Sequence, residues 1–464
     1  MISIDTLPDD ALLVIFDHYV DGVRLEGISQ KAEMTWRLLV QVCRRWRGIV
    51  FESPRRLNLR LFCTGRTPAR DRLDVCPTLP LVIEVNFGDS IQSVDNIIAA
   101  LERTDCVCQI DLGSAWSSDM AMVLPEMQQP FPELTNMQLW SIDETVPVIP
   151  DSFLGGSTPR LEHLVLSRIP FPGLPKLLFS ATQLITLHLY SIPHSGYFPP
   201  DEMATVLPTL TSLNSFELQF ISTRSCPDRE SRRSPPSTRP VVHVLTEFRF
   251  KGVSEYLEDL VACIDAPQLK YLHITFFNDI VFDTPQLIRF LRQTPKLNAL
   301  EKASITLWDR AAMIKFSSQT FRDRNFVVEI SCKGLDWQLS SLEQVFSSCL
   351  PSLSMLENLY FYEDSRPDWK DNIDNGLWLE LLRPFSAVKN LYLSKNVASR
   401  VAPALQELVG DRTTEVLPTI LPALQNIFVR GLESSGSVQK GIGQFVAARQ
   451  VTSLPITISR WTYY

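Results

Sequence analysis

The chain has 464 residues, of which 45% are hydrophobic and 21% are charged, as is typical of a globular protein with a large core. Its net charge of −8 gives no bulk attraction for nucleic acid or for an anionic membrane, so we expect neither as a partner. The apolar run 11–16 is too short to span a membrane, and nine cysteines without paired spacing fit reduced thiols in the cytoplasm or nucleus.

The first 53 residues predict a head of two or three short helices. The first apolar stripe has helical spacing after Pro8 and two aspartates, and a second stripe ends at the Ser-Pro pair that begins at Ser53. The first stripe comprises Leu12, Ile15, Phe16 and Tyr19, and the second Trp36, Leu39, Cys43, Trp46 and Val50. So few residues make a small core. We therefore expect surplus apolar surface that either covers the end of a repeat array or docks onto a partner.

The sequence motif of the head is more specific than its helical periodicity. LP-x-x-x-L-x-x-IF followed by VCRRW closely resembles the F-box, the module that docks onto the Skp adaptor of cullin–RING ubiquitin ligases, over residues 4 to about 52. The segment 21–34 between the two halves is longer than usual. The resemblance implies adaptor binding through the residues on the motif's recurrent positions, which are Leu7, Pro8, Leu12, Ile15, Phe16, Val20, Leu39, Val42, Cys43, Arg44 and Trp46.

A second pattern, L-x-x-L-x-L, recurs through the rest of the chain. Its first apolar positions, called anchor positions below, are Leu134, Leu161, Leu184, Leu213, Leu245, Leu269, Leu297, Leu356, Val388 and Leu424. Weaker copies begin at Pro80, Val107 and Val451. The long interval between Leu297 and Leu356 predicts one hidden unit, with a strand at 326–331. Such a period indicates a repeat array.

Within each unit, apolar positions two apart predict a strand, and the stretches 93–104, 254–265 and 284–295 have helical spacing. Stacked strand–helix units give an α/β fold with parallel strands on the concave face and helices on the convex face. This resembles a degenerate leucine-rich-repeat solenoid over residues 54–464, after an F-box domain at 1–53, as in many fungal F-box proteins. The family usually has an asparagine or cysteine in the turn after each strand, and in this sequence only Asn396 matches. The equivalent positions of other repeats hold apolar residues such as Ile169 and Ile192, which predicts turns filled by apolar packing.

Residues 222–240 are rich in arginine, proline and serine, which predicts a mobile loop inserted between repeats. The Ser-Pro sequence at Ser234 next to arginines leaves open a phosphorylation-controlled switch.

The positions between the buried leucines should point to the concave side, and many hold residue types that are common in interfaces. We predict client-protein binding by Trp140, Tyr190, Arg249, His273, Tyr360, Tyr392 and Arg430. Inward Leu164, Leu187, Leu272 and Leu391 should support the core, whereas Tyr190, His273, Tyr360 and Tyr392 should tolerate truncation.

The sequence shows little support for catalysis. His163, His188 and His273 lie within predicted strands without metal-ligand spacing, and Cys106 and Cys108 form a single C-x-C that fits buried thiols. We therefore expect no cofactor, no metal and no enzymatic activity of its own. The leading hypothesis is a non-catalytic substrate receptor of a Skp–cullin–F-box ubiquitin ligase. The alternative is a repeat scaffold for protein–protein interaction without a ubiquitin role.

Overall fold

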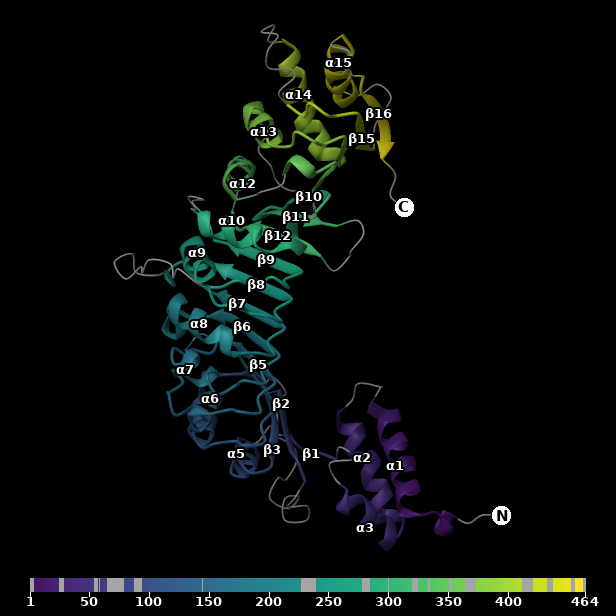
Figure 1. The fold of residues 1–464 in the computed structure, drawn as a ribbon, viewed down its shortest axis with the longest axis vertical. Helices are drawn as coiled ribbons and strands as arrows, with labels where there is room; N and C mark the ends of the chain where they lie inside the picture. Colours follow the sequence, from purple (N-terminus) through teal and green to yellow (C-terminus); the bar gives the residue numbers. More distant parts are fainter. Residues whose placement is uncertain are drawn as a thin grey trace. The chain divides into compact units, whose positions relative to one another are not determined.

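The computed structural model describes residues 4–24, 29–53, 57, 59–64, 79–86, 94–143, 145–226, 239–277, 284–298, 300–318, 324–332, 334–349, 353–363, 373–410, 420–431, 437–451 and 455–461. Two compact units, Met1–Phe198 and Pro199–Tyr464, make up the chain (Figure 1). Most of the predicted loop at 222–240, including Ser234, lies outside the described residues. In the part of the chain that is described, no helix has the length and apolar character that crossing a bilayer requires.

The head at the start of the first unit consists of α1 (Asp9–Arg24), α2 (Ser29–Val42) and α3 (Arg44–Glu52), after the short helix η1 (Ile4–Thr6). Its core is formed by apolar side chains that are fully or nearly buried, among them Leu12, Phe16, Trp36, Leu39 and Val50. The indole Nε1 of Trp36 donates a hydrogen bond to the Arg60 carbonyl at 3.3 Å, just before the first strand. This hydrogen bond connects the head to the residue before β1.

The described strands of the first unit pair in parallel and in chain order, from β1 to β6. They are β1 (Leu61–Cys63), β2 (Leu81–Asn86), β3 (Val107–Ala115), β4 (Asn136–Ser141), β5 (His163–Ser167) and β6 (Thr186–Ile192). The helical segments between them are short: α5 (Val94–Leu101), α6 (Ser117–Val123), η2 (Leu124–Gln128), η3 (Phe153–Gly156) and α7 (Leu174–Leu178). The short helix η4 (His194–Gly196) follows β6. Strand β1 was not among the predicted repeats.

The second unit continues the same alternation with longer helices. Its strands are β7 (Ser215–Phe220), β8 (Glu247–Gly252), β9 (Tyr271–Phe276), β10 (Lys302–Leu307), β11 (Ala312–Ser317), β12 (Asn325–Ile330), β13 (Asn358–Glu363), β14 (Asn390–Leu393), β15 (Asn426–Arg430) and β16 (Thr457–Trp461). Its helices are α8 (Pro200–Val206), η5 (Leu207–Thr209), α9 (Ser254–Ala262), α10 (Pro285–Arg292), α11 (Pro295–Asn298), α12 (Leu335–Cys349), η7 (Leu353–Met355), α13 (Asn375–Leu382), α14 (Lys395–Gly410) and α15 (Ser437–Val451). The helices cover one side of the sheet (Figure 1).

The interval between Leu297 and Leu356 holds three strands, so the prediction of one hidden repeat is wrong. Strand β10 pairs with β13 in parallel, β11 returns antiparallel to β10, and β12 runs antiparallel to β11 and parallel to β9. The predicted strand at 326–331 is confirmed as β12. The Trp308 N–H donates a hydrogen bond to the Ala311 carbonyl at 2.9 Å and closes the turn from β10 to β11. This turn is too short for a helical crossover, so β11 must run antiparallel to β10.

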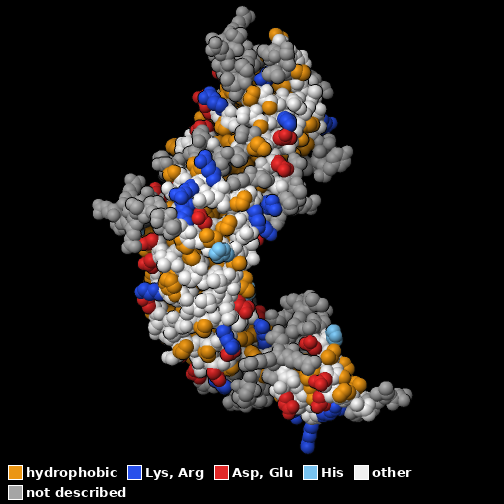
Figure 2. Space-filling model, in the orientation of Figure 1, with side chains coloured by type: hydrophobic (Ala, Val, Ile, Leu, Met, Phe, Trp, Pro, Cys, Tyr) orange, Lys and Arg blue, Asp and Glu red, His pale blue; other side chains and the backbone are white. Residues whose placement is uncertain are grey.

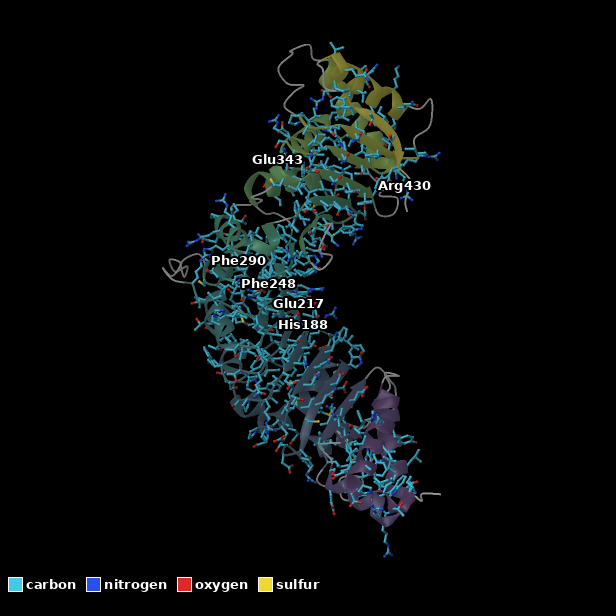
Figure 3. All side chains as sticks on the ribbon, turned by 45° about the vertical axis from the view of Figure 1, so that its right-hand side comes forward. His188, Glu217, Phe248, Phe290, Glu343 and Arg430 are labelled. Carbon is cyan, nitrogen blue, oxygen red and sulfur yellow. The ribbon has the colours of Figure 1, made fainter. Side chains whose placement is uncertain are left out.

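The predicted anchor positions form the buried row on which the repeats stack, because all of them are at most 7% exposed. In nine of the ten repeats the strand begins two residues after the anchor, and the exception is Leu297, which precedes β10 by five residues. The next inward positions, such as Leu164, Leu187, Leu272 and Leu391, are also buried, as predicted. The other row of each strand faces away from the helices and forms what we call the open face. Figure 3 shows Arg430 on the strand side of the second unit, and Phe290 and Glu343 on its helix side.

The turns after the strands are only partly apolar. Arg168 and Ser191 adopt left-handed backbone conformations (φ 57° and 51°), and the following Ile169 and Ile192 are buried, as predicted. Asn396, by contrast, is exposed, and its backbone N–H donates to Glu363 Oε1 at 3.1 Å at the start of α14. Carboxylates therefore complete some turns by accepting hydrogen bonds from helix N-termini.

The most buried of these carboxylates belongs to Glu258 on α9. It is 9% exposed and accepts hydrogen bonds from the backbone N–H groups of Gln286 (2.9 Å) and Leu287 (2.7 Å) in the first turn of α10. Since both donors would otherwise lack a helical partner, Glu258 joins two successive repeats.

We predict that Glu258→Gln lowers the free energy of unfolding by about 1–2 kcal/mol, because the amide offers one accepting oxygen in place of a charged pair of oxygens. The matched control is Glu255→Gln on the same helix, which should change stability by less than about 0.5 kcal/mol. Thermal melts of both variants measure the difference, and equal melting temperatures would contradict the capping role.

Candidate functional site

The structure divides the predicted adaptor-binding residues between the core and the surface of the head. Leu12, Phe16 and Leu39 are buried. Leu7, Cys43 and Trp46 are half-buried, whereas Pro8, Ile15, Val42 and Arg44 are exposed, and the side chain of Val20 lies outside the described residues. The motif therefore mixes residues that fold the head with residues that a partner can reach.

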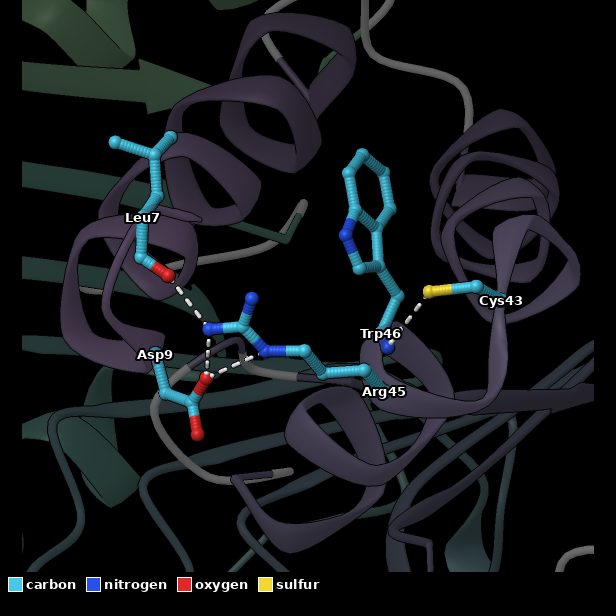
Figure 4. A network of polar contacts seen from close by, with 5 residues as sticks. All are labelled: Leu7, Asp9, Cys43, Arg45 and Trp46. Atoms are coloured by element: carbon cyan, nitrogen blue, oxygen red, sulfur yellow. Dashed lines mark hydrogen bonds and ion pairs between the residues drawn. The ribbon is translucent and has the colours of Figure 1, made fainter. Parts of the chain in front are cut away.

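A polar network connects the two halves of the motif (Figure 4). The Arg45 guanidinium donates to the Leu7 carbonyl at 2.5 Å and to Asp9 Oδ1 at 2.5 and 3.0 Å. Cys43 Sγ accepts a hydrogen bond from the Trp46 N–H at 3.4 Å and so caps α3. Arg45, which the sequence interpretation passed over in favour of Arg44, is thus the arginine that holds the start of α1.

Aromatic packing joins the same halves, since the rings of Phe16 and Trp46 lie 4.7 Å apart at 57°. Phe16 is completely buried, so its truncation would test the folding of the head before it tested any interface.

Apolar side chains remain exposed on α1 and α2, where they form what we call the head rows: Val14, Ile15, Tyr19, Leu38 and Val42. They are between 45% and 59% exposed, and Ile15–Tyr19 and Leu38–Val42 each lie one helical turn apart. Figure 2 shows hydrophobic side chains on the visible side of the head. Exposed apolar rows on a small helical domain are typical of a protein-binding surface.

On the open face of the first unit, the predicted client residues are separate from one another. Trp140 on β4 is 61% exposed. Tyr190 on β6 is half-buried, and its hydroxyl lies 3.2 Å from Nδ1 of His188. On β2 and β3, Glu84 and Asp111 are direct neighbours, and burial, together with the charge of Asp111 on Glu84, raises the pKa of both carboxyls.

The open face of the second unit begins with charged side chains on β7, β8, β9 and β12. Glu217 lies on this face, but it is only 5% exposed and accepts a hydrogen bond from the Gln219 amide. Arg249 stacks over the Tyr271 ring at 4.9 Å from its centre. His273 Nε2 lies 3.5 Å from Glu329 Oε2. The predicted residues Arg249 and His273 are therefore neighbours in register, each with a partner in the chain.

Further along this face, aromatic side chains form a stack across adjacent strands. The ring of Tyr392 on β14 lies parallel to those of Tyr360 on β13 (4.2 Å) and Phe428 on β15 (4.5 Å). Lys302 Nζ on β10 lies 4.1 Å from the centre of the Tyr360 ring. The predicted residues Tyr360 and Tyr392 are thus brought into direct contact, while Arg430 is exposed at the end of β15.

A row of amides runs beside this stack. The Asn390 amide donates to Asn358 at 2.9 Å, the Asn426 amide donates to Asn390 at 2.8 Å, and the Thr457 hydroxyl donates to Asn426 at 2.5 Å. The sequence interpretation missed this row, although Asn-Leu-Tyr at 358 and 390 and Asn-Ile-Phe at 426 carry its signal. It holds the strands of the aromatic stack in one register.

We find no group of three or more histidine, cysteine or acidic side chains that could hold a metal ion among the described residues. Cys106 and Cys108 are half-buried near the start of β3, and burial raises the pKa of both thiols. This favours the interpretation of the C-x-C pair as structural thiols.

Thiol reactivity offers a direct check of burial. Burial, with a smaller contribution from Asp336, raises the pKa of Cys332 to about 11, whereas Cys226 is exposed. A raised pKa keeps the thiol protonated at pH 8, so we expect iodoacetamide to alkylate Cys332 about a hundredfold or more slowly than Cys226. Peptide mass spectrometry over a time course measures the ratio, and comparable rates would show that Cys332 is accessible.

The aromatic stack revises the expectation for outward tyrosines. Because Tyr392 contacts a ring on each side, Tyr392→Ala should cost about 1–2 kcal/mol of stability rather than nothing. Leu391→Ala on the same strand should cost about 2–5 kcal/mol, because it leaves a cavity beneath the sheet. Thermal melts measure the stability of both variants, with Thr186→Ala, an open-face change outside the stack, as the control. A larger loss of stability in Tyr392→Ala than in Leu391→Ala would mean that the strand faces are reversed.

No protein-family model matches the sequence, and no curated protein matches it significantly. Among solved structures, the chain is similar to the leucine-rich repeat-containing protein LegL7 from Legionella pneumophila, with 12% identity, coverage of 83% of this chain and 97% of that one, and a TM-score of 0.27. A TM-score this low adds nothing to the repeat architecture that the strand register shows directly.

Proposed function

We propose that the protein is the substrate receptor of a Skp–cullin–F-box ubiquitin ligase, with the head bound to a Skp-type adaptor and the repeats bound to a client protein. The observation that carries the proposal is the pair of head rows. A sequence that resembles the F-box folds into three helices and leaves apolar side chains of α1 and α2 in solvent. Such a surface gains free energy when a partner covers it.

The repeats support the second half of the proposal by offering a long row of open-face side chains. A client bound there would be held close to the conjugating enzyme that the ligase recruits. The contribution to catalysis is then proximity, which turns a bimolecular transfer into a local one. The receptor itself needs no catalytic group for this, and it would act in the cytoplasm or nucleus.

The alternative is a repeat scaffold without a ubiquitin role, in which the head only covers the first strands. One observation favours it: Arg45, Cys43, Phe16 and Trp46 are all engaged within the head, and Trp36 connects the head to the residue before β1. Much of the motif would then be explained by folding alone. Adaptor binding separates the two functions.

The decisive variants carry a charge on the head rows. We expect Val42→Asp and Ile15→Asp each to weaken adaptor binding by about 2–4 kcal/mol, the range for a central interface side chain. The matched control is Val451→Asp on α15, where the valine is 86% exposed and lies outside the head. Calorimetric titration with a purified Skp-type adaptor measures the affinities, and circular dichroism checks that each variant folds.

An intact chain that does not bind the adaptor at micromolar concentration would refute the ligase proposal and leave the scaffold. Binding that survives both head variants would show that the adaptor uses another surface.

A further inference from the structure

Two lysines lie next to each other on the open face of the second unit. Lys302 on β10 and Lys315 on β11 belong to paired strands, where they are diagonal neighbours in the register. Both are half-buried, and neither forms an ion pair with any residue that the structure describes. Burial, followed by the charge of Lys315, lowers the pKa of Lys302. An anion placed between the two ammonium groups would relieve this repulsion.

The aromatic stack adjoins these lysines and is also compatible with an anion. Lys302 covers one face of the Tyr360 ring and Tyr392 stacks against the ring, so an incoming ligand meets the ring edges. Ring edges carry the positive part of the aromatic quadrupole. Burial, and then the neighbouring Tyr392, raises the pKa of Tyr360 to about 12.

Trp461 is an example of a side chain from a more distant strand that packs on this stack. Its strand, β16, pairs with β15, yet its indole reaches back to rings on β13 and β14, at 5.5 Å from Tyr362, 5.5 Å from Tyr392 and 6.0 Å from Tyr360. The indole is tilted by 52° to 63° against these rings.

The charge pattern along the face limits the anion to a short one. Strand β12, next to β11, carries Glu329. A continuous polyanion such as RNA, with a phosphate at every nucleotide, would extend from the two lysines onto this carboxylate. A short peptide can place its few carboxylates at the two lysines and a neutral residue near Glu329. The net charge of −8 opposes both ligands, and it opposes the more highly charged polyanion more strongly.

We propose that this Lys–Tyr surface, formed by Lys302, Lys315, Tyr360, Tyr362, Tyr392 and Trp461, binds an acidic segment of a client protein. Aspartate or glutamate side chains of the segment pair with the two lysines, a neutral residue lies near Glu329, and the remaining atoms lie along the tyrosine edges and the indole. The inference deepens the client-binding half of the proposed function and rests on it.

The test uses a fluorescein-labelled ten-residue peptide of alternating glutamate and serine, titrated with the full-length protein in low salt. We expect saturable binding that weakens about fivefold or more in Lys302→Gln and in Lys315→Gln, and that falls with added salt. The matched control is Lys251→Gln, a lysine on the open-face row of β8 outside the surface, which should keep its affinity within about twofold.

Two comparison probes make the result specific. A lysine–serine peptide of the same length should not bind, and a ten-nucleotide oligouridylate should bind more weakly than the acidic peptide. Affinity that is unchanged in both lysine variants, or that is higher for the oligouridylate, would overturn the inference. Adaptor titration of the unmodified chain runs in parallel and separates the two proposals. A chain that binds the peptide but not the adaptor would refute the ligase proposal alone, whereas a chain that binds the adaptor but not the peptide would refute the Lys–Tyr surface alone.

Discussion

The structure depends on one constraint, the parallel pairing of strands whose side chains alternate between two faces. Because each strand buries one row against the helices, an apolar residue at the anchor position and apolar residues two apart in the strand must recur in every repeat. The same alternation turns the other row outward without any further requirement on its composition. Side chains on the open face are therefore free to serve recognition, provided that the buried row is complete.

This freedom is not total in the second unit. Tyr360, Tyr392 and Phe428 stack on one another, and the asparagines beside them form a chain of hydrogen bonds. Cross-strand contacts of this kind stabilise the sheet and also fix the spacing of whatever the open face presents. Stability and recognition thus share residues in the aromatic stack, whereas Trp140 in the first unit contributes to the open face while remaining mostly in solvent.

The sequence predicted the repeats well because their signal is local. An anchor leucine followed two residues later by alternating apolar positions located nine strands, and the strand at 326–331 was confirmed. It could not show that β11 runs antiparallel to its neighbours or that β12 pairs with β9, since strand direction depends on the turn at 308–311 and the pairing joins distant parts of the sequence. Glu258 was equally hidden, because its hydrogen-bond partners lie in the next repeat.

For the candidate sites, the sequence identified residue types and faces but not contacts. The F-box resemblance marks Phe16 and Ile15 alike, yet one is buried in the head and the other is exposed. Lys302 and Trp461 contact the aromatic stack from strands that are distant in the sequence, so no local sequence pattern predicts these contacts. Only the register between strands brings these side chains together.

Oxidative cross-linking tests that register most directly. Tyr360 and Tyr392 are register partners on adjacent parallel strands, at a Cα spacing of roughly 4.8 Å that a disulfide can bridge. The account predicts that the double variant Tyr360→Cys, Tyr392→Cys forms this disulfide on mild oxidation, detected by peptide mass spectrometry, whereas Tyr360→Cys with Leu391→Cys does not. Cross-linking of the second pair and not the first would contradict the register on which the open face and its proposed partners rest.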